Sequence, residues 1–295
     1  MTPNTPPSLT PEQVQGLQAW TGRTDHLSDT ATQAPARGLA ATLDQAGDTH
    51  VDAALLPPLW HWLYFLPQAP QSQLGPDGHP RRGGFLPPVP LPRRMWAGSQ
   101  LRWFTRNPLR LGQALERHSR IASVEHKQGR SGEMVFVKVE HTVHNPHGPA
   151  LQEFHDIVYR HASPAGEPAQ PGVPADTGAP WQREWLPDAV MLFRYSALTF
   201  NGHRIHYDRA YTQQEEGYPG LVVHGPLIAT LLLELVRQHT PERAVASFQF
   251  RAQRPSFDGR ALRVNGAPSP DGRSVRLWAQ DADGFLTMSA SAEFA

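Results

Sequence analysis

Two stretches of the sequence bring together side chains that could exchange protons or hold a metal ion. The first, FNGHRIHYD (200–208), places His203 and His206 three positions apart beside an asparagine, an arginine and an aspartate. The second, HGPLIATLLLEL (224–235), begins with His224 and continues into aliphatic residues. Imidazole titrates near neutral pH and is a common metal ligand. These polar groups beside an apolar run therefore form an active site, a metal site or a chance grouping.

The metal alternative would use His203, His206 and His224, with Asp208 as a fourth ligand. These histidines lack the i, i+4 helical spacing of zinc-binding pairs, and the chain contains no cysteine to support them. We therefore expect no metal. A single histidine beside an apolar helix is more often a hydrogen-bonded structural residue than a ligand. A purely structural role therefore stays open for His203 and His224.

The composition excludes several classes of protein. Lysine plus arginine and aspartate plus glutamate each total 27 in 295 residues, so the net charge is zero and no overall field attracts nucleic acid or a membrane. The absence of cysteine excludes disulfides and a thiol nucleophile. No apolar run approaches the roughly 20 residues that span a bilayer, and the N-terminus lacks a signal-peptide pattern. We expect a soluble cytoplasmic protein.

The sequence of the second half predicts one apolar helix followed by four strands. Residues 226–238 are apolar nearly all round and begin with Pro226 after Gly225, which predicts a buried helix with proline in its first turn. Alternation of apolar and polar residues between Gly, Pro and Asp turns predicts antiparallel strands. These strands are expected at 246–253, 261–268, 274–281 and 285–294.

The first half has the same order of elements. An apolar helix is predicted over 55–66 (LLPPLWHWLYFL), followed by strands at 99–104, 118–128, 133–143 and 151–160. A Pro/Gly/Ala-rich stretch, 162–180, reads as an extended, solvated linker between the halves. A sheet wrapped around a central helix is the hot-dog arrangement, so the chain predicts an α+β double hot dog. An unspecified pair of α+β domains remains the alternative.

The segment 195–227 (YSALTFNGHRIHYDRAYTQQEEGYPGLVVHGPL) resembles the signature region of the MaoC-like, or hydratase 2, hot-dog enzymes. More closely, the chain resembles two-domain mesaconyl-C4-CoA (3-methylfumaryl-CoA) hydratases and type 2 hydroxyacyl-thioester dehydratases, including at 90–103 and 250–259. The resemblance implies a degenerate substrate-groove domain (1–161), the linker 162–180 and a catalytic domain (181–295). It also implies reversible hydration of an acyl-CoA without a further cofactor, in a homodimer or a larger assembly.

The family signature reads G-D-x-N-P, an aliphatic residue, then His. Aligned with it, His206 falls on the catalytic histidine and Ile205 on the aliphatic position, while Asn201 takes the place of the catalytic aspartate. The other departures are Phe200, His203 and Arg204. The histidine is present and the carboxylate is not, so a simple acid–base pair within the signature is in doubt.

Adding water to an enoyl thioester needs a base for the water, a proton for the α-carbon and a donor for the enolate oxygen. His206 can act as the base, and Asn201 can hold the water through its amide. The free N–H groups at the start of the helix after Gly225 can face the enolate oxygen. Asp208 is the next candidate for orienting His206 or holding the water if Asn201 is only structural.

Further residues are predicted to bind substrate. Tyr195, Ser196 and His224 are expected to line the acyl site, whereas His61 is interpreted as packing in the first half. Arginine pairs bidentately with phosphate or carboxylate groups. The arginine candidates for the CoA phosphates or a substrate carboxylate are Arg93, Arg94, Arg204, Arg251 and Arg254.

Three functions remain in competition. The first is hydration of a short branched dicarboxylyl-CoA such as 3-methylfumaryl-CoA, giving citramalyl-CoA, or of a close C5 relative such as itaconyl-CoA. The second is a 3-hydroxyacyl-ACP or -CoA dehydratase of fatty acid metabolism. The third belongs to another class, a non-catalytic acyl-CoA-binding hot dog. A thioesterase is disfavoured because no carboxylate adjoins Gly225.

Overall fold

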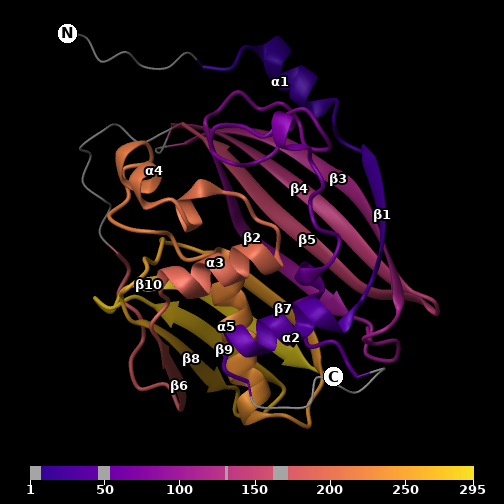
Figure 1. Ribbon diagram of the computed structural model, residues 1–295, viewed down its shortest axis with the longest axis vertical. Coiled ribbons are helices and arrows are strands. Elements are labelled where there is room, and N and C mark those ends of the chain that lie inside the picture. Colours follow the sequence, from indigo (N-terminus) through magenta and orange to yellow (C-terminus); the bar gives the residue numbers. More distant parts are fainter. Residues whose placement is uncertain (1–7, 46–53, 130–131, 162–171) are drawn as a thin grey trace.

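The computed structural model describes residues 8–45, 54–129, 132–161 and 172–295 (Figure 1). Their strands form one ten-stranded antiparallel sheet in the order β1-β3-β4-β5-β2-β7-β10-β9-β8-β6. The strands of the first half are β1 (Thr24–Thr30), β2 (Arg93–Trp103), β3 (Ala114–Gly129), β4 (Gly132–Asn145) and β5 (Gly148–Arg160). Those of the second half are β6 (Trp181–Trp185), β7 (Val245–Ala252), β8 (Leu262–Pro268), β9 (Ser274–Gln280) and β10 (Leu286–Phe294).

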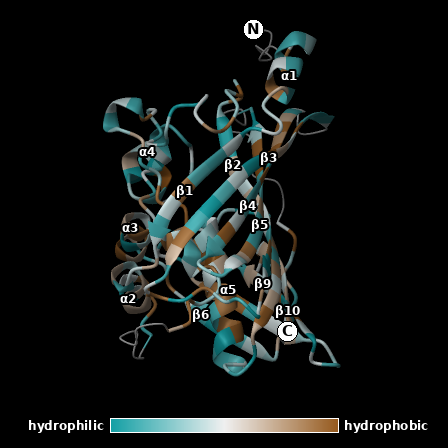
Figure 2. Cartoon of the chain, turned by 90° about the vertical axis from the view of Figure 1, so that its right-hand side faces the viewer, coloured by the Kyte–Doolittle hydropathy of each residue, from teal (hydrophilic) through white to brown (hydrophobic). Residues whose placement is uncertain are grey.

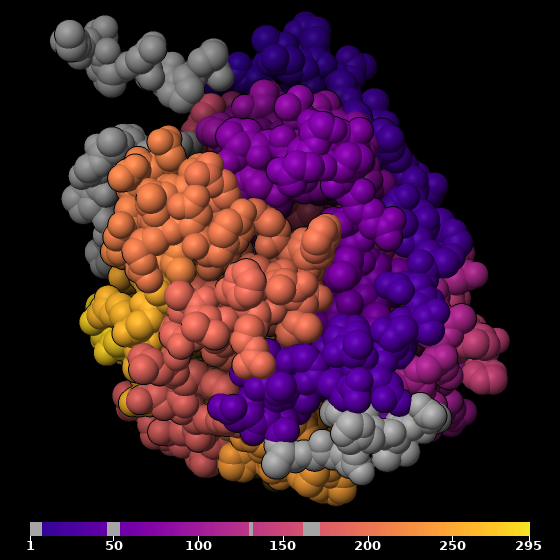
Figure 3. All heavy atoms as spheres, viewed as in Figure 1, coloured from indigo at the N-terminus to yellow at the C-terminus, as the bar shows by residue number. Residues whose placement is uncertain are grey.

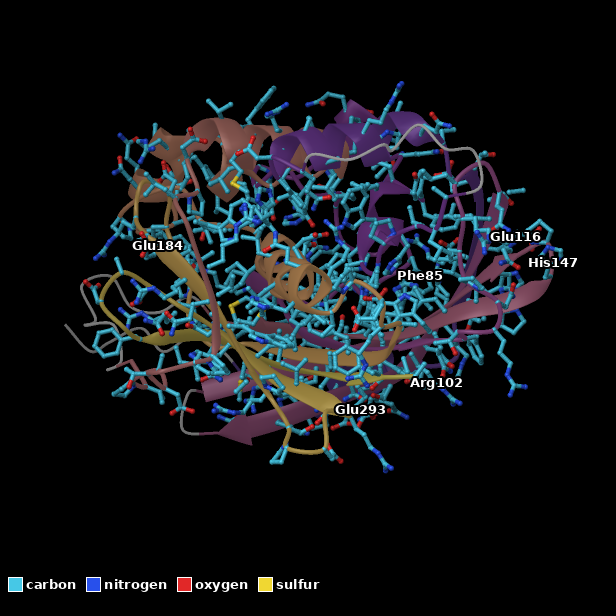
Figure 4. All side chains as sticks on the ribbon, turned by 90° about the horizontal axis from the view of Figure 1, so that it is seen from below. Phe85, Arg102, Glu116, His147, Glu184 and Glu293 are labelled. Carbon is cyan, nitrogen blue, oxygen red and sulfur yellow. The ribbon has the colours of Figure 1, made fainter. Side chains whose placement is uncertain are left out.

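The two halves join where β2 pairs with β7, with Ser99 opposite Phe250. Each half thus contributes its own block of neighbouring strands, and the blocks share one continuous sheet. Glu116 of β3 and Glu184 of β6 lie near its opposite margins (Figure 4). The sheet is antiparallel throughout, as the alternating sequence pattern predicted.

One long helix lies against this sheet. α5 (Gly225–His239) is buried from Leu227 to Val236, because apolar residues cover most of its circumference, with Thr230 and Glu234 as the polar exceptions. Figure 4 shows α5 nearly end-on between the sheet and a second layer formed by α2 (Gln33–Thr42) and α3 (Ala189–Leu198). Brown, hydrophobic residues gather along α5 and the strand faces near it, whereas the outer strand faces carry teal, polar residues (Figure 2).

The helix predicted over 55–66 is wrong. Only a short 3-10 turn, η1 (Trp60–Leu63), forms there. Pro57 and Pro58 remove two backbone donors and disfavour helical geometry in the residue before each of them. Leu59 and Phe65 adopt left-handed backbone angles, with φ of 70° and 56°. In its described residues, the first half therefore has no long central helix.

The turn η1 still connects the first half to the central helix. The indole Nε1 of Trp60 donates to Glu234 Oε1 on α5 at 3.2 Å, and Trp60 is fully buried. α5 itself packs on β6, β8, β9 and β10, so Trp60 connects the first half to the central helix of the second half.

The eight predicted strands are present, with ends that differ by a few residues. β1 and β6 were not predicted, and neither were the helices α1 (Pro11–Gln18), α2, α3 and α4 (Arg209–Gln214) nor the 3-10 turns η2 (Gln71–Gln73) and η3 (Arg204–His206). No helix among the described residues is long and apolar enough to cross a membrane.

The predicted linker is described only in its second part, since residues 162–171 lie outside the described residues. Residues 172–180 form neither a helix nor a strand, and Pro174 forms an isolated antiparallel bridge with Phe285. The N–H of Ala175 also donates to the carbonyl of Gly284 at 2.9 Å. The start of this stretch therefore lies alongside the turn that precedes β10.

Candidate active site

A cavity of about 2340 Å³ is lined by residues from both halves of the chain. It opens on the face of the molecule where residues near 200–215, in orange, meet residues near 60–100, in purple (Figure 3). From the second half it is lined by the segment 199–207 and by the start of α5. From the first half it is lined by η1, the loop 74–80 and the inner faces of β2 to β5.

His206 is held at this cavity in a single orientation. It ends the short turn η3 and is 7% exposed. Its Nδ1–H donates to the carbonyl oxygen of Val222 at 2.7 Å, which leaves Nε2 as the acceptor nitrogen of the neutral ring. Burial lowers the pKa of His206 to about 4, although the hydrogen bond to Val222 opposes this effect. A neutral imidazole with a free Nε2 is the form that a general base requires.

His224 packs directly on His206. Their rings stack with centroids 3.7 Å apart, and His224 is fully buried. The Nε2 of His224 lies 2.9 Å from the Ser196 hydroxyl, while its Nδ1 is buried without a hydrogen-bond partner. Burial, reinforced by the neighbouring histidines, holds the pKa of His224 well below its usual range. The residue therefore fixes the ring of His206 and connects it to α3.

Asn201 lies in a sharp turn after α3. Phe200 adopts a left-handed φ of 48°, and the Oδ1 of Asn201 accepts the backbone N–H of His203 at 3.0 Å. Asn201 also lines the cavity. One lone pair of the amide oxygen is thus used locally, and the amide N–H₂ group has no partner among the described residues.

The start of α5 faces the same cavity. The first intrahelical hydrogen bond runs from the Ile228 N–H to the His224 carbonyl. Pro226 has no N–H, and the N–H groups of Gly225 and Leu227 have no partner among the described residues. A Cβ built at Gly225 would meet no protein atom within 4 Å, and Gly225 lines the cavity. Two free donors and the positive end of the helix dipole are therefore available.

The five candidate arginines are placed differently. Arg93 pairs with Glu216, Arg204 with Asp208 at 2.7 Å and Arg254 with Asp281 at 3.4 Å. These three line the cavity with their charges already paired. Arg251 is exposed on β7 and does not belong to the cavity lining.

Arg94 differs from the other four candidates. It lines the cavity, is partly buried and has no carboxylate partner among the described residues. Its positive charge contributes to the lowered pKa of both His79 and His203, after the larger effect of burial. Among the candidates, Arg94 is therefore the cation available for an anionic ligand.

Tyr195 and Asp208, two other residues singled out from the sequence, differ in their relation to the cavity. Tyr195 on α3 is buried, lines the cavity and packs 5.0 Å from the His224 ring. Asp208 caps α4 by accepting the Tyr211 N–H at 3.0 Å and pairs with Arg204. It therefore does not orient His206.

The loop 74–80 of the first half brings side chains to the site that the sequence did not indicate. Asp77, His79 and His203 place one ligand atom each within 4.8 Å of one another. The His79 and His203 rings are 4.1 Å apart, and His203 meets the His206 ring edge-on at 5.4 Å. No local signal links Asp77 to a segment more than 120 residues away.

A second polar group lies on the inner face of the first half. Glu153 on β5 is 2% exposed and lines the cavity. Its carboxylate lies 2.9 Å from His61 Nε2, 2.7 Å from His155 Nε2 and 3.2 Å from Trp62 Nε1. Burial acts to raise the pKa of Glu153, but the interactions with His155 and His61 hold it well below its usual range. His61, interpreted from the sequence as packing, is part of this charged group.

Arg117 on β3 completes the polar lining of the first half. Its guanidinium lies over the Phe65 ring at 5.2 Å, and its Nε is buried without a hydrogen-bond partner. Burial lowers the pKa of Arg117, partly offset by the negative charges of Glu153 and Asp25. The first-half end of the cavity therefore carries buried charged groups beside aromatic and aliphatic side chains.

The fold defines the class of protein. A MaoC-like dehydratase from Phytophthora capsici superposes with a TM-score of 0.71 at 13% identity, covering 96% of this chain and 97% of that one. A Mycobacterium tuberculosis protein described as a double hot dog gives 0.57 at 14%, covering 93% and 96%. The chain is thus a double hot dog with the MaoC-like arrangement, and the predicted fold class is confirmed.

Sequence comparison defines the family. The model for hydroxyacyl-thioester dehydratase type 2 matches residues 59–258. The chain is 47% identical over 284 residues to mesaconyl-C(4)-CoA hydratase of Chloroflexus aurantiacus, covering 93% of this chain and 96% of the relative. It is 30% identical over 270 residues to the mitochondrial hydroxyacyl-thioester dehydratase type 2 of Schizosaccharomyces pombe, covering 81% and 88%. The chain belongs to the hydroxyacyl-thioester dehydratase type 2 family.

Proposed function

We propose that the protein hydrates an enoyl-CoA thioester reversibly, with 3-methylfumaryl-CoA (mesaconyl-C4-CoA) as substrate and citramalyl-CoA as product. The observation that carries this proposal is His206, a buried neutral imidazole whose Nδ1 is committed to Val222 and whose Nε2 is free. It lines the same cavity as the unpaired N–H groups at the start of α5. The name of the Chloroflexus relative supports the choice of acyl group.

The residues divide the chemistry of hydration between them. His206 Nε2 takes a proton from water as the hydroxyl bonds to the β-carbon. Asn201 holds that water through its free amide hydrogens and remaining lone pair. The N–H groups of Gly225 and Leu227 donate to the thioester oxygen as it becomes an enolate, where preorganised donors stabilise developing charge. CoA is part of the substrate, and this scheme needs no further cofactor.

The charged lining of the first half supports a short dicarboxylyl group over a fatty acyl chain. A long apolar chain there would take Arg117, whose buried Nε has no hydrogen-bond partner, further out of water, which costs several kcal/mol for a charged group. A carboxylate on the β-carbon would instead meet Arg94, the unpaired cation near His203. The fatty acyl dehydratase, favoured by the Schizosaccharomyces relative, is the second candidate.

The two halves have separate parts in this proposal. Residues 1–161 shape the acyl and CoA groove, and residues 181–295 carry His206, Asn201 and the start of α5. A cytoplasmic location and assembly into homodimers stay predictions.

The direct test is hydration of purified 3-methylfumaryl-CoA. The reaction is monitored through the loss of enoyl-thioester absorbance and, by mass spectrometry, through the gain of one water. We expect turnover by the wild type and a fall on the order of 10²-fold or more in His206→Gln, since a positioned base contributes at least that much. Circular dichroism and melting should remain unchanged. Full activity in His206→Gln would refute the assignment, and binding of the thioester without turnover by the wild type would favour the non-catalytic alternative.

The acyl selectivity is tested with Arg94→Met. We expect kcat/KM for 3-methylfumaryl-CoA to fall about 10²-fold, because a buried carboxylate loses its charged partner. Crotonyl-CoA, which has no carboxylate, should be affected much less. Arg251→Met is the matched control, since Arg251 is exposed outside the cavity. Equal losses on both substrates, or efficient turnover of long fatty enoyl-CoAs, would favour the fatty acyl dehydratase.

A further inference from the structure

The family signature has a carboxylate that the segment 200–206 lacks. Asn201 stands in its place, and the next carboxylate along the chain, Asp208, pairs with Arg204 and caps α4. The base His206 is held by the backbone carbonyl of Val222 and not by a carboxylate. The structure nevertheless contains a carboxylate beside this segment, Asp77, which comes from the other half.

The loop that carries Asp77 is fitted to the catalytic segment by its backbone. The Arg204 N–H donates to the Asp77 carbonyl at 2.9 Å, and Arg204 Nη1 donates to the Pro76 carbonyl at 3.0 Å. A Cβ at Gly78 would lie 1.8 Å from the Gly202 carbonyl oxygen, and Gly78 has a left-handed φ of 86°. Only glycine permits this approach, so the loop position is built into the site.

Asp77 holds its neighbouring histidine in one tautomer. Its Oδ1 accepts the His79 backbone N–H at 3.0 Å, and its Oδ2 lies 3.2 Å from His79 Nδ1. Because a carboxylate can only accept, the Nδ1–H of His79 donates and the lone pair or second proton is on Nε2. This carboxylate–imidazole pair lies against His203, which in turn contacts His206.

The surroundings give His79 and His206 different basicities. His206 is paired with a neutral carbonyl, whereas His79 is paired with a carboxylate that favours its protonated form. Burial lowers the pKa of both rings, and Asp77 opposes that effect only at His79. Burial also acts to raise the pKa of Asp77, but the hydrogen bond and charge of His79 hold it well below its usual range.

We propose that Asp77 and His79, contributed by the first half, supply the carboxylate–imidazole pair that the signature segment lacks, with His79 as the proton donor to the α-carbon. Asp77 acts as a positioning residue through His79. Resting on the proposed hydration, the assignment gives each imidazole one task. His206 is the base for water and His79 is the acid for carbon.

The proton balance closes over one turnover. His206 Nε2 takes one proton from water, and the hydroxyl oxygen bonds to the β-carbon as the double-bond electrons move toward the thioester. The protonated His79 then gives its Nε2 proton to the α-carbon as the enolate collapses. The proton on His206 returns to His79 through His203 or solvent, so water is the only compound consumed. In dehydration, His79 takes the α-proton and His206 protonates the leaving hydroxyl.

The test is the pH profile of hydration in Asp77→Asn. Asparagine keeps the oxygen that accepts the His79 N–H, so the loop should fold unchanged. We expect kcat to fall about tenfold or more. The basic limb of the profile, which reports loss of the His79 proton, should move to lower pH by about one unit or more, because the charge favouring protonated His79 is gone. In His79→Gln, kcat should fall on the order of 10²-fold, and the basic limb should disappear from the pH profile.

The titratable and charged groups that face His79 define what else could move that limb. They are Asp77 on the same loop, Arg82, Arg94 on β2, and His203 and His206 of the segment 200–206. Arg94→Met is expected to move the basic limb upward, opposite to Asp77→Asn, because it removes a positive charge. The two variants together therefore identify the group that titrates.

Glu184→Gln is the control. It removes a carboxylate that pairs with Arg263 outside the cavity lining, so rate and basic limb should stay as in the wild type. Wild-type turnover with an unmoved basic limb in Asp77→Asn and normal activity in His79→Gln would overturn this inference alone. A wild type without turnover would overturn the proposed function as well. Loss of wild-type activity on dialysis against EDTA, restored by a divalent cation, would reassign Asp77, His79 and His203 to a metal.

Discussion

Gly225→Ala separates the role of the helix start in catalysis from any role in folding. Gly225 occupies the first helical position of α5, its φ is not left-handed, and an added Cβ would meet no protein atom within 4 Å. Alanine is the better helix former by up to about 1 kcal/mol. The substitution should therefore leave the melting temperature unchanged or raise it slightly.

The effect on activity follows from where the added methyl lies. It would project from a residue that lines the cavity, beside the free N–H groups of Gly225 and Leu227. The thioester oxygen must come within about 3 Å of these donors to benefit from them, and loss of one such donor costs about 2.7–4 kcal/mol in known oxyanion holes. We therefore expect kcat/KM for 3-methylfumaryl-CoA to fall on the order of 10²-fold.

The assay is initial-rate hydration alongside thermal unfolding on the same samples. Gly16→Ala is the matched control, since Gly16 is a helical glycine on α1 whose added Cβ also meets open space and which does not line the cavity. It should change neither rate nor fold. Full activity in Gly225→Ala would refute the placement of the thioester oxygen at the start of α5. A clear drop in melting temperature would show that the methyl meets protein and not ligand.

Two further predictions concern the histidines. Asn201→Asp should raise the pKa of His206 and move the acid limb of kcat/KM, which for the wild type should lie near pH 4, to higher pH. Asn201→Ala should lower the rate without moving that limb, and full activity there would make Asn201 only a turn residue. His203, His206 and His224 all have folded-state pKa values below 6.5. The unfolded chain therefore binds more protons, so stability is full above pH 6.5 and is lost as the pH falls. The melting temperature should fall steeply as the pH is lowered from 7 to 4. For three such groups, the free energy of unfolding should change with a slope approaching about 4 kcal/mol per pH unit. A melting temperature independent of pH in this range would contradict their burial as neutral rings.

The sequence predicted those elements whose own residues determine them. β4 alternates buried and partly exposed residues along its whole length, and α5 is apolar nearly all round from Leu227 to Val236. β1 and β6, by contrast, contain many polar residues and lie at the sheet edges, so their sequences show no buried face. The run 55–66 is apolar because it is buried, not because it is helical. Hydrophobicity predicted its burial correctly and its secondary structure wrongly.

The candidate site divides in the same way. His206, Asn201, Gly225 and His224 come from one continuous segment, and each of them lines the cavity or packs on a residue that does. Asp77 and Glu153 each pair with a histidine two positions away, His79 and His155, but that spacing by itself marks no site. The contacts that make these pairs notable, with His203 and His61, come from distant segments. The close approach of Gly78 to Gly202 and the pairing of β4 with β5 exist only in the folded chain.

The charged group around Glu153 indicates what the cavity is for. A chain selected only for stability would fill the space left by the missing helix with apolar side chains, since replacing a buried ion pair by packed hydrophobic residues is often neutral or stabilising. Instead Glu153 and His61 are buried there as a pair, with His155 partly buried beside them, and Arg117 has a buried Nε without a partner. The Arg117 guanidinium costs free energy until an acceptor meets its Nε. A short acyl group that carries its own charge meets that requirement, and a fatty acyl chain does not. These charged residues, which lie beside the apolar core of the first half, therefore favour the dicarboxylyl substrate.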